Sequence, residues 1–242
     1  MFRSLLSAVL CLAASSAAAA EFSVSPIRVE LARGARSAAV SVANDDERPL
    51  RMELRLMEWT QDGDGKDVHR ESDALIYYPR QMTVLPREKR LVRIGVKAAN
   101  GAAEQTYRLY IDELPADADS GARPAASGVN FTIRFALPVF VPPAQPVLRG
   151  VIDSVTLQDG KLRVAVRNAG NQSFRITTVG VRGGAFAAEA AGWYLLAGAM
   201  RVYGFDIPPE ACRGLRRLDI TVRADRLALE GGLDVDAGMC PR

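Results

Sequence analysis

Apolar residues recur at every second position along much of the chain, which is the spacing of strands whose alternate side chains face opposite sides of a sheet. The clearest run is the segment VNFTIRFALPVFVPP at residues 129–143, where six apolar side chains alternate: Val129, Phe131, Ile133, Phe135, Leu137 and Val139. Pro138, on the opposite face, has no backbone N–H to donate, so this strand is expected at a sheet edge. Long apolar edges promote aggregation unless they pair with another chain. The segment therefore predicts an edge strand that binds a partner.

Similar short runs predict strands over most of the sequence, and helical periodicity is nearly absent. In the first half the expected strands are 22–31, 38–42, 50–59, 82–85, 90–96, 106–114 and 129–141. After a proline-rich connector at 141–146 the pattern restarts, with strands expected at 151–157, 162–166, 174–181, 193–196, 200–207, 218–222 and 233–235, and an alanine- and glycine-rich loop at 183–192. Turn-forming sequences such as Asn100-Gly101 separate the runs. This spacing predicts two β-sandwich domains rather than a barrel or an α/β fold.

The first 20 residues have the pattern of a secretion signal. Arg3 provides a positive charge, residues 5–12 an apolar stretch, and Ala18 and Ala20 a small-residue cleavage site. An uncleaved N-terminal anchor is the alternative. We expect a signal peptide at 1–20, an N-terminal domain that includes the edge strand at 21–143, and a C-terminal domain at 144–242. No later segment is long and apolar enough for stable membrane insertion.

Charge and candidate chemistry argue against an enzyme. The formal net charge is +3, and it falls to +2 without Arg3; the basic residues are scattered among acids, which does not indicate a nucleic-acid partner. His69 is the only histidine, so a catalytic triad or a histidine-rich metal site has little to build on. No CxxC pair, P-loop or GxGxxG motif is present. We therefore expect no catalytic residues, no metal and no cofactor.

Two cysteines follow the expected cleavage site, Cys212 and Cys240. In an exported protein an even number of cysteines favours a disulfide, and two free buried thiols are the alternative.

Four segments, in order, resemble the periplasmic pilus-assembly chaperones of the chaperone–usher pathway. They are FSVSPIRVEL at 22–31, SVANDDERPL at 41–50, EQTYRLYIDELP at 104–115 and LPVFVPP at 137–143, and a weaker similarity continues through LRVAVRNAGNQSFRIT and YLLAGAMRVY. The resemblance implies an all-β chain of two immunoglobulin-like sandwich domains joined by a proline-rich hinge. It also implies a periplasmic location, pilus or fimbrial subunits as partners, and delivery of those subunits to an outer-membrane usher, without enzymatic activity.

The resemblance also assigns site residues. Arg28 matches the family arginine that binds the terminal carboxylate of a bound subunit, a task suited to the planar guanidinium. A lysine is the family's second anchor, but Pro138 stands at its position, so the chain is expected to belong to a divergent branch. Arg108 is the preferred replacement cation and Arg134 the second choice.

Two further groups of residues follow from the same alignment. Val129, Phe131, Ile133 and Phe135 match the donor residues that fill an open groove in the subunit; the alternative is that they belong to the protein's own core. Arg93 and Glu104 match an ion pair that joins the two domains, and Asp225 is the candidate for its third member.

Two other functions remain as alternatives. A pilus structural subunit would be a single incomplete sandwich with a free N-terminal donor peptide, whereas here a strand begins almost at the cleavage site. An exported carbohydrate-binding or other β-sandwich interaction module would need clustered aromatic residues, and the sequence suggests no such cluster, because Trp59 and Trp193 belong to different domains.

Overall fold

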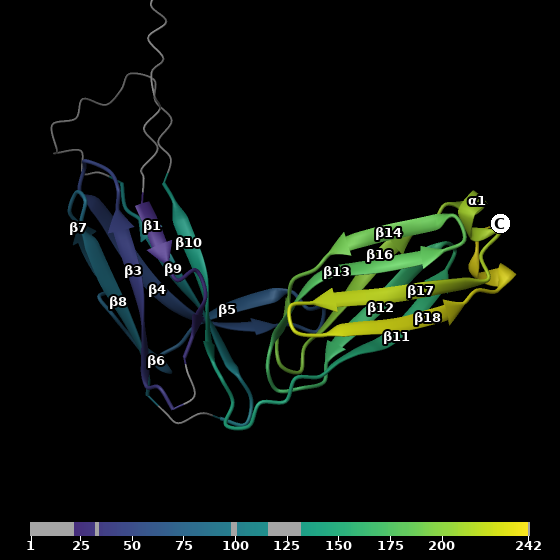
Figure 1. Ribbon diagram of the computed structural model, residues 1–242, viewed down its shortest axis with the longest axis horizontal. Coiled ribbons are helices and arrows are strands. Elements are labelled where there is room, and N and C mark those ends of the chain that lie inside the picture. Colours follow the sequence, from purple (N-terminus) through teal and green to yellow (C-terminus); the bar gives the residue numbers. More distant parts are fainter. Residues whose placement is uncertain (1–21, 32–33, 98–100, 116–131, 242) are drawn as a thin grey trace, which may run out of the picture.

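The computed structural model describes residues 22–31, 34–97, 101–115 and 132–241, and almost all of its elements are strands. They form two β-sandwiches of two sheets each, set at an angle to one another (Figure 1). This confirms the predicted all-β fold with two immunoglobulin-like sandwiches. The expected signal peptide at 1–20 lies outside the described residues. Within the part of the chain that the structure describes, no helix is long and apolar enough to cross a membrane.

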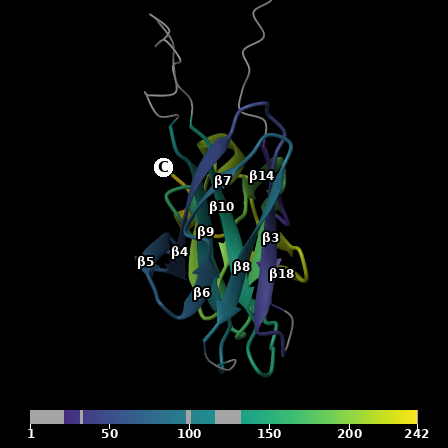
Figure 2. The same ribbon diagram turned by 90° about the vertical axis from the view of Figure 1, so that its left-hand side faces the viewer.

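The first sandwich is built from two sheets with the strand orders β1-β3-β8-β6 and β2-β10-β9-β4-β5, and β7 pairs with β4 (Figure 2). Their inner faces share a core that includes Val40, Leu54, Ile94 and Leu109, because apolar side chains alternate along each strand. The strands are β1 (Phe22–Ser25), β2 (Val29–Glu30), β3 (Ser37–Asn44), β4 (Leu50–Gln61), β5 (Asp67–Glu71), β6 (Leu75–Tyr78), β7 (Gln81–Val84), β8 (Lys89–Val96), β9 (Gln105–Glu113) and β10 (Arg134–Val141).

Strand β10 has one side largely open. It is antiparallel to β9 along its whole length, but on its other side only Val139 and Phe140 are paired, to the two residues of β2. Among the described residues, no strand pairs with this side of β10 from Arg134 to Pro138. The position of Pro138 therefore agrees with the expected edge strand.

The second sandwich has sheets with the orders β11-β12-β16 and β14-β13-β17-β18, and β15 pairs with β13. Its elements are β11 (Gly150–Gln158), β12 (Lys161–Asn168), β13 (Phe174–Gly183), β14 (Phe186–Ala191), β15 (Tyr194–Leu195), β16 (Met200–Asp206), α1 (Pro209–Cys212), β17 (Arg217–Ala224), β18 (Ala228–Asp234) and a short 3-10 helix (Ala237–Met239). Leu162, Phe174 and Ile220 are among its buried core residues.

A buried asparagine closes an equivalent corner in each sandwich. Asn44, which is 1% exposed, donates from its amide to the carbonyl oxygens of the residue four positions later and of Val84, and accepts the N–H two positions later. Asn168, also 1% exposed, makes the same three bonds, with Leu195 as its distant partner. Buried amides need such complete pairing, so these asparagines fix the loop after the strand in both sandwiches.

The structure corrects several predicted elements. Residues 183–192, expected as a loop, contain β14, whose alanines have low strand propensity but pair with β13 over Thr178–Gly183. The expected strand at 22–31 is divided into β1 and β2, which join different sheets. Strands β5 and β6 were not predicted, because β5 is mostly polar and both are short.

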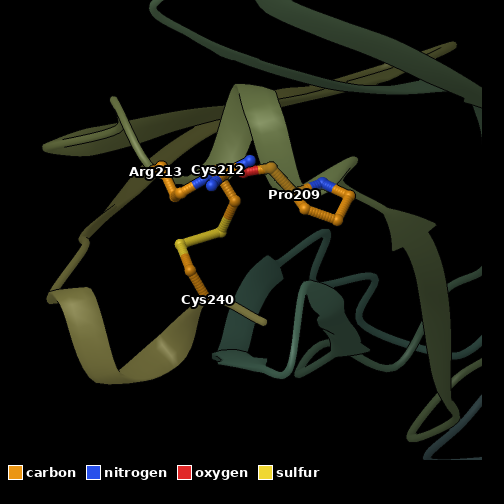
Figure 3. The surroundings of a disulfide bond; sticks show 4 residues. All are labelled: Pro209, Cys212, Arg213 and Cys240. Carbon is orange, nitrogen blue, oxygen red and sulfur yellow. Dashed lines mark hydrogen bonds between the residues drawn. A yellow bond between two sulfur atoms is a disulfide. The ribbon is translucent and has the colours of Figure 1, made fainter. Parts of the chain in front are cut away.

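The expected disulfide joins Cys212 at the end of α1 to Cys240 near the C-terminus (Figure 3). Both cysteines are buried at the end of the second core, and their Cα atoms are 5.6 Å apart. The bond closes a loop of chain that contains β17 and β18. It therefore joins the segment that follows the edge strand β18 to the end of α1.

Removing this disulfide is expected to destabilise the second sandwich by about 3–4 kcal/mol, because the open chain gains conformational entropy when it unfolds. Urea unfolding of the Cys212→Ala/Cys240→Ala variant, compared with the native protein, measures the loss. Alkylation of both cysteines in the unfolded native protein without any reductant, read as an increase of the intact mass, would contradict the bond itself.

Candidate functional site

A third apolar cluster lies where the two sandwiches meet. Trp59 on β4 and Phe140 on β10 come from the first sandwich, and Tyr194 on β15 and Leu196 come from the second. Trp59 and Phe140 are on the outer face of their sheet. They therefore pack against residues of the second sandwich and not in the core of the first. The Tyr194 ring centroid is 5.3 Å from that of Trp59 and 5.7 Å from that of Phe140. Ring contacts therefore link the two sandwiches directly.

Arg28 lies between β1 and β2 at the edge of this cluster. Its Cζ atom is 4.4 Å from the Phe140 ring centroid and 5.6 Å from that of Tyr194, and its Nη1 donates to the Tyr194 hydroxyl at 3.4 Å. Its Nε donates to Glu30 at 2.7 Å. Burial lowers the pKa of Arg28, but the hydrogen bond and charge of Glu30 outweigh burial and raise the pKa. The guanidinium stays charged and partly accessible, with 28% of its side chain exposed.

Arg108 on β9 also contacts this cluster. Its Cζ atom is 3.8 Å from the Trp59 ring centroid, 5.7 Å from that of Trp193 and 5.9 Å from that of Tyr194. Only 7% of the residue is exposed, and its Nη1 donates a hydrogen bond of 3.4 Å to the carbonyl oxygen of Ala136. Burial lowers the pKa of Arg108. The charge of Asp67 opposes this effect of burial, but no carboxylate among the described residues forms a direct ion pair with Arg108, so it is a buried cation without a directly bonded counter-ion.

Arg134 is placed apart from these two cations. It forms an ion pair with Asp112, which also binds Arg55 at 2.7 Å. Burial raises the pKa of Asp112, but the two arginines outweigh burial and lower the pKa. The strand register puts Arg134 opposite Asp112 and Pro138 opposite Arg108, so Arg134 is four positions along β10 from the residue that faces Arg108. The structure brings Arg28 and Arg108 together around Tyr194 and does not bring Arg134 to them.

The expected donor residues are only partly covered by the structure. Val129 and Phe131 lie outside the described residues. Ile133 is half-buried just before β10, and its backbone exchanges hydrogen bonds with Glu113, since its N–H donates to the carboxylate and its carbonyl accepts the Glu113 N–H. Phe135 is half-buried, packs on the first core and contacts Phe22 edge-on at 5.2 Å. The free edge thus begins beside the protein's own core.

The three residues expected to form an interdomain ion network are separated in the structure. Arg93 is exposed on β8, and among the described residues no ion pair joins it to Glu104 or Asp225. Glu104 does bridge the sandwiches, because its carboxylate accepts the backbone N–H of Ser173 at 2.7 Å. Burial raises its pKa, and the Ser173 bond opposes that rise. Asp225 stays within the second sandwich and accepts the Arg175 N–H at 3.0 Å.

The aromatic cluster was missed by sequence reasoning. Trp59 and Trp193 were expected to lie apart in different domains, yet both contact Arg108. The only sequence signal was that a tryptophan and a tyrosine adjoin at the start of a predicted strand of the second domain. A cavity of about 580 Å³ beside Trp59 is lined by Gln61, Glu104 and Leu196 among others. No group of three or more His, Cys, Asp or Glu side chains in the described ranges is arranged to hold a metal ion.

Comparison with known proteins gives a family and a fold. The family model described as "Pili and flagellar-assembly chaperone, PapD N-terminal domain" matches residues 21–146, more than half of the 242 residues. No curated protein matches the chain.

Three solved structures illustrate the similarity of fold. A chain of the CsuC–CsuE chaperone–tip adhesion subunit pre-assembly complex, from archaic Csu pili of Acinetobacter baumannii, has a TM-score of 0.63 at 22% identity; the match covers 87% of this chain and 98% of that one. The class 5 fimbriae chaperone CfaA has a TM-score of 0.58 at 12% identity, with 89% and 100% covered. A chain of the Salmonella enterica SafA pilin–SafB chaperone complex has a TM-score of 0.55 at 15% identity, with 89% and 97% covered.

Proposed function

Because this chain belongs to the family of pili and flagellar-assembly chaperones, we propose that it captures pilus subunits by donating the open edge of β10 and by holding their terminal carboxylate between Arg28 and Arg108. Chaperones of this family are non-enzymatic, work in the periplasm and pass their subunits to an outer-membrane usher. Donation of a strand completes the subunit's sheet through main-chain hydrogen bonds, and alternate side chains fill its groove. We also propose export by a cleaved signal peptide at 1–20 and domain limits of 21–143 and 144–242.

The observation that carries the carboxylate site is the pair of arginines around Tyr194. Arg28 offers a charged, partly exposed guanidinium, and Arg108 is a buried cation that the charge of Asp67 acts on but that forms no direct ion pair among the described residues. A buried charge without a directly bonded partner is costly, so an incoming carboxylate would gain charged hydrogen bonds and supply that partner. Arg108 thereby takes the part of the family lysine that Pro138 replaces. The open side of β10 begins opposite Arg108, which places the donor edge and the charge site next to each other.

Purification of the tagged protein from the periplasm of cells that make a pilus tests this proposal. We expect a fimbrial subunit in a one-to-one complex with the protein, identified by native mass spectrometry. A protein that is recovered without any subunit while the cells assemble pili would contradict the proposal.

Separate substitutions distinguish Arg108 from Arg134. Arg108→Met keeps much of the apolar stem and removes the charge, so it is expected to lower the affinity for the subunit about 10- to 100-fold, the effect of losing a charged hydrogen bond. Arg134→Met is the matched control and is expected to leave affinity unchanged, since its partner is Asp112. Titration calorimetry with a purified subunit gives both values. If Arg134→Met has the larger effect, Arg108 is not the second anchor.

A further inference from the structure

The β4–β5 hairpin extends from the first sandwich to the second (Figure 1). Its turn is internally fixed: the Asp62 carboxylate accepts the N–H groups of Asp64 and Lys66 at 2.9 Å each, and the Asp62 N–H donates to the Lys66 carbonyl at 3.0 Å. A turn with this many internal hydrogen bonds can act as a rigid contact element rather than as a loose loop.

Gln61, the last residue of β4, uses its whole amide at the junction. Its Nε2 donates to the Tyr194 carbonyl at 2.9 Å and to the Asp67 carboxylate at 3.0 Å, and its Oε1 accepts the Leu196 N–H at 3.0 Å. Two of the three bonds reach the backbone of the second sandwich, on either side of Leu195. Because the amide both donates to and accepts from this backbone, it fixes the direction of β15 and its distance from β4.

The rest of the hairpin adds contacts beside this one. The second carboxylate oxygen of Asp67 accepts the indole N–H of Trp193 at 2.9 Å. Arg201 donates to the Gly65 carbonyl at 2.7 and 3.2 Å. Gly65 has φ +75°, and a Cβ built on it would lie 2.5 Å from the Met200 carbonyl oxygen, so only glycine permits this approach.

These contacts hold a residue of the second sandwich that lies beside both cations. Tyr194 lies beside Arg28 and Arg108, which both belong to the first sandwich, and Gln61 and Asp67 hold Tyr194 and its neighbour Trp193. We propose that the hairpin is a clasp that sets the angle between the sandwiches, and that Gln61 and Asp67 are positioning residues for carboxylate capture that do not touch the subunit. The inference rests on the proposed function. A preformed site lowers the ordering cost of binding.

Gln61→Glu tests the clasp at nearly constant shape, because it places an oxygen against the Tyr194 carbonyl and the Asp67 carboxylate. Gln158→Glu is the matched control, since Gln158 is exposed at the far end of β11. The probe is a short peptide of alternating valine and threonine, made with a free terminal carboxylate or a terminal amide. We expect Gln61→Glu to weaken binding of the acid about tenfold and to leave binding of the amide unchanged. Equal affinities of Gln61→Glu and the control for the acid would overturn the inference.

Small-angle X-ray scattering of the free proteins tests the clasp without any ligand. The distribution of interatomic distances is expected to broaden in Gln61→Glu, and to stay native in Gln158→Glu. A native distribution in Gln61→Glu overturns the clasp whatever the peptides do. If the wild-type protein binds acid and amide equally while the scattering of Gln61→Glu changes, the carboxylate site is wrong and the clasp stands.

Discussion

Replacement of Arg28 by alanine is expected to abolish subunit capture and to leave the fold intact. Arg28 lies in a loop between two short strands. Its contacts are to Glu30, Phe140 and Tyr194, at the edge of the apolar cluster where the two sandwiches meet. Removal of the side chain therefore takes little from either core. A bound carboxylate would lose two charged hydrogen bonds, which amounts to roughly a 100-fold or greater fall in affinity.

Two further variants define the effect of Arg28. Arg163→Ala removes an exposed arginine from the surface of β12 and controls for the change in net charge. Arg28→Lys keeps the positive charge but loses the planar guanidinium, which can bind a carboxylate through two hydrogen bonds. Its affinity for the subunit is expected to lie between those of the native protein and Arg28→Ala. The measurements are the yield of subunit complex from the periplasm and the melting temperature of each variant. A native yield of complex from Arg28→Ala would show that the carboxylate is held elsewhere.

Serine at both Phe131 and Ile133 is expected to remove subunit binding and leave the melting temperature close to native. Ile133 is only half-buried, its backbone is held by Glu113, and Phe131 lies outside the described residues. A serine hydroxyl that enters an apolar groove loses its hydrogen bonds to water, which opposes binding. Differential scanning calorimetry and pull-down of a subunit measure the two effects.

Leu137→Ser is the control for this pair, because Leu137 faces inward on the same strand and is 2% exposed. It is expected to cost about 2–5 kcal/mol of folding free energy, as core truncations do. Phe135 packs on the core beside Phe22, so the loss of folding free energy in Phe135→Ser is expected to lie between the losses of these two variants. If the Phe131/Ile133 variant melts as early as Leu137→Ser, these residues belong to the protein's own core and the donor assignment falls.

The strand edge was predictable from sequence because its signal is local. Alternation within residues 129–141 and the proline at 138 are properties of one segment, and β10 follows them from Arg134 to Val141. Strand β5 was not predictable, because Asp67–Glu71 is mostly polar and is ordered by pairing with β4. Alternation along a chain reveals strands that bury an apolar face, and says little of a mostly polar strand that is held by pairing with its neighbour.

Arg108 likewise shows what the sequence pattern could and could not predict. Arg108 was a candidate because its strand was expected to neighbour the donor strand and is rich in aromatic residues, and the structure places it against Trp59, where the two sandwiches meet. Its surroundings could not be predicted, since Trp193 and Tyr194 come from the other sandwich and meet Trp59 only once the two sandwiches are packed.

Both tryptophans of the chain are within 6 Å, by ring centroid, of the same guanidinium, at 3.8 Å for Trp59 and 5.7 Å for Trp193. Both indoles of the chain therefore report on the surroundings of Arg108, where the two sandwiches meet. Trp59 is fully buried, whereas Trp193 is 37% exposed, so their emission bands differ in wavelength. If a subunit carboxylate binds Arg108 as proposed, its arrival and departure are expected to change tryptophan emission, so binding can be followed in real time without any label.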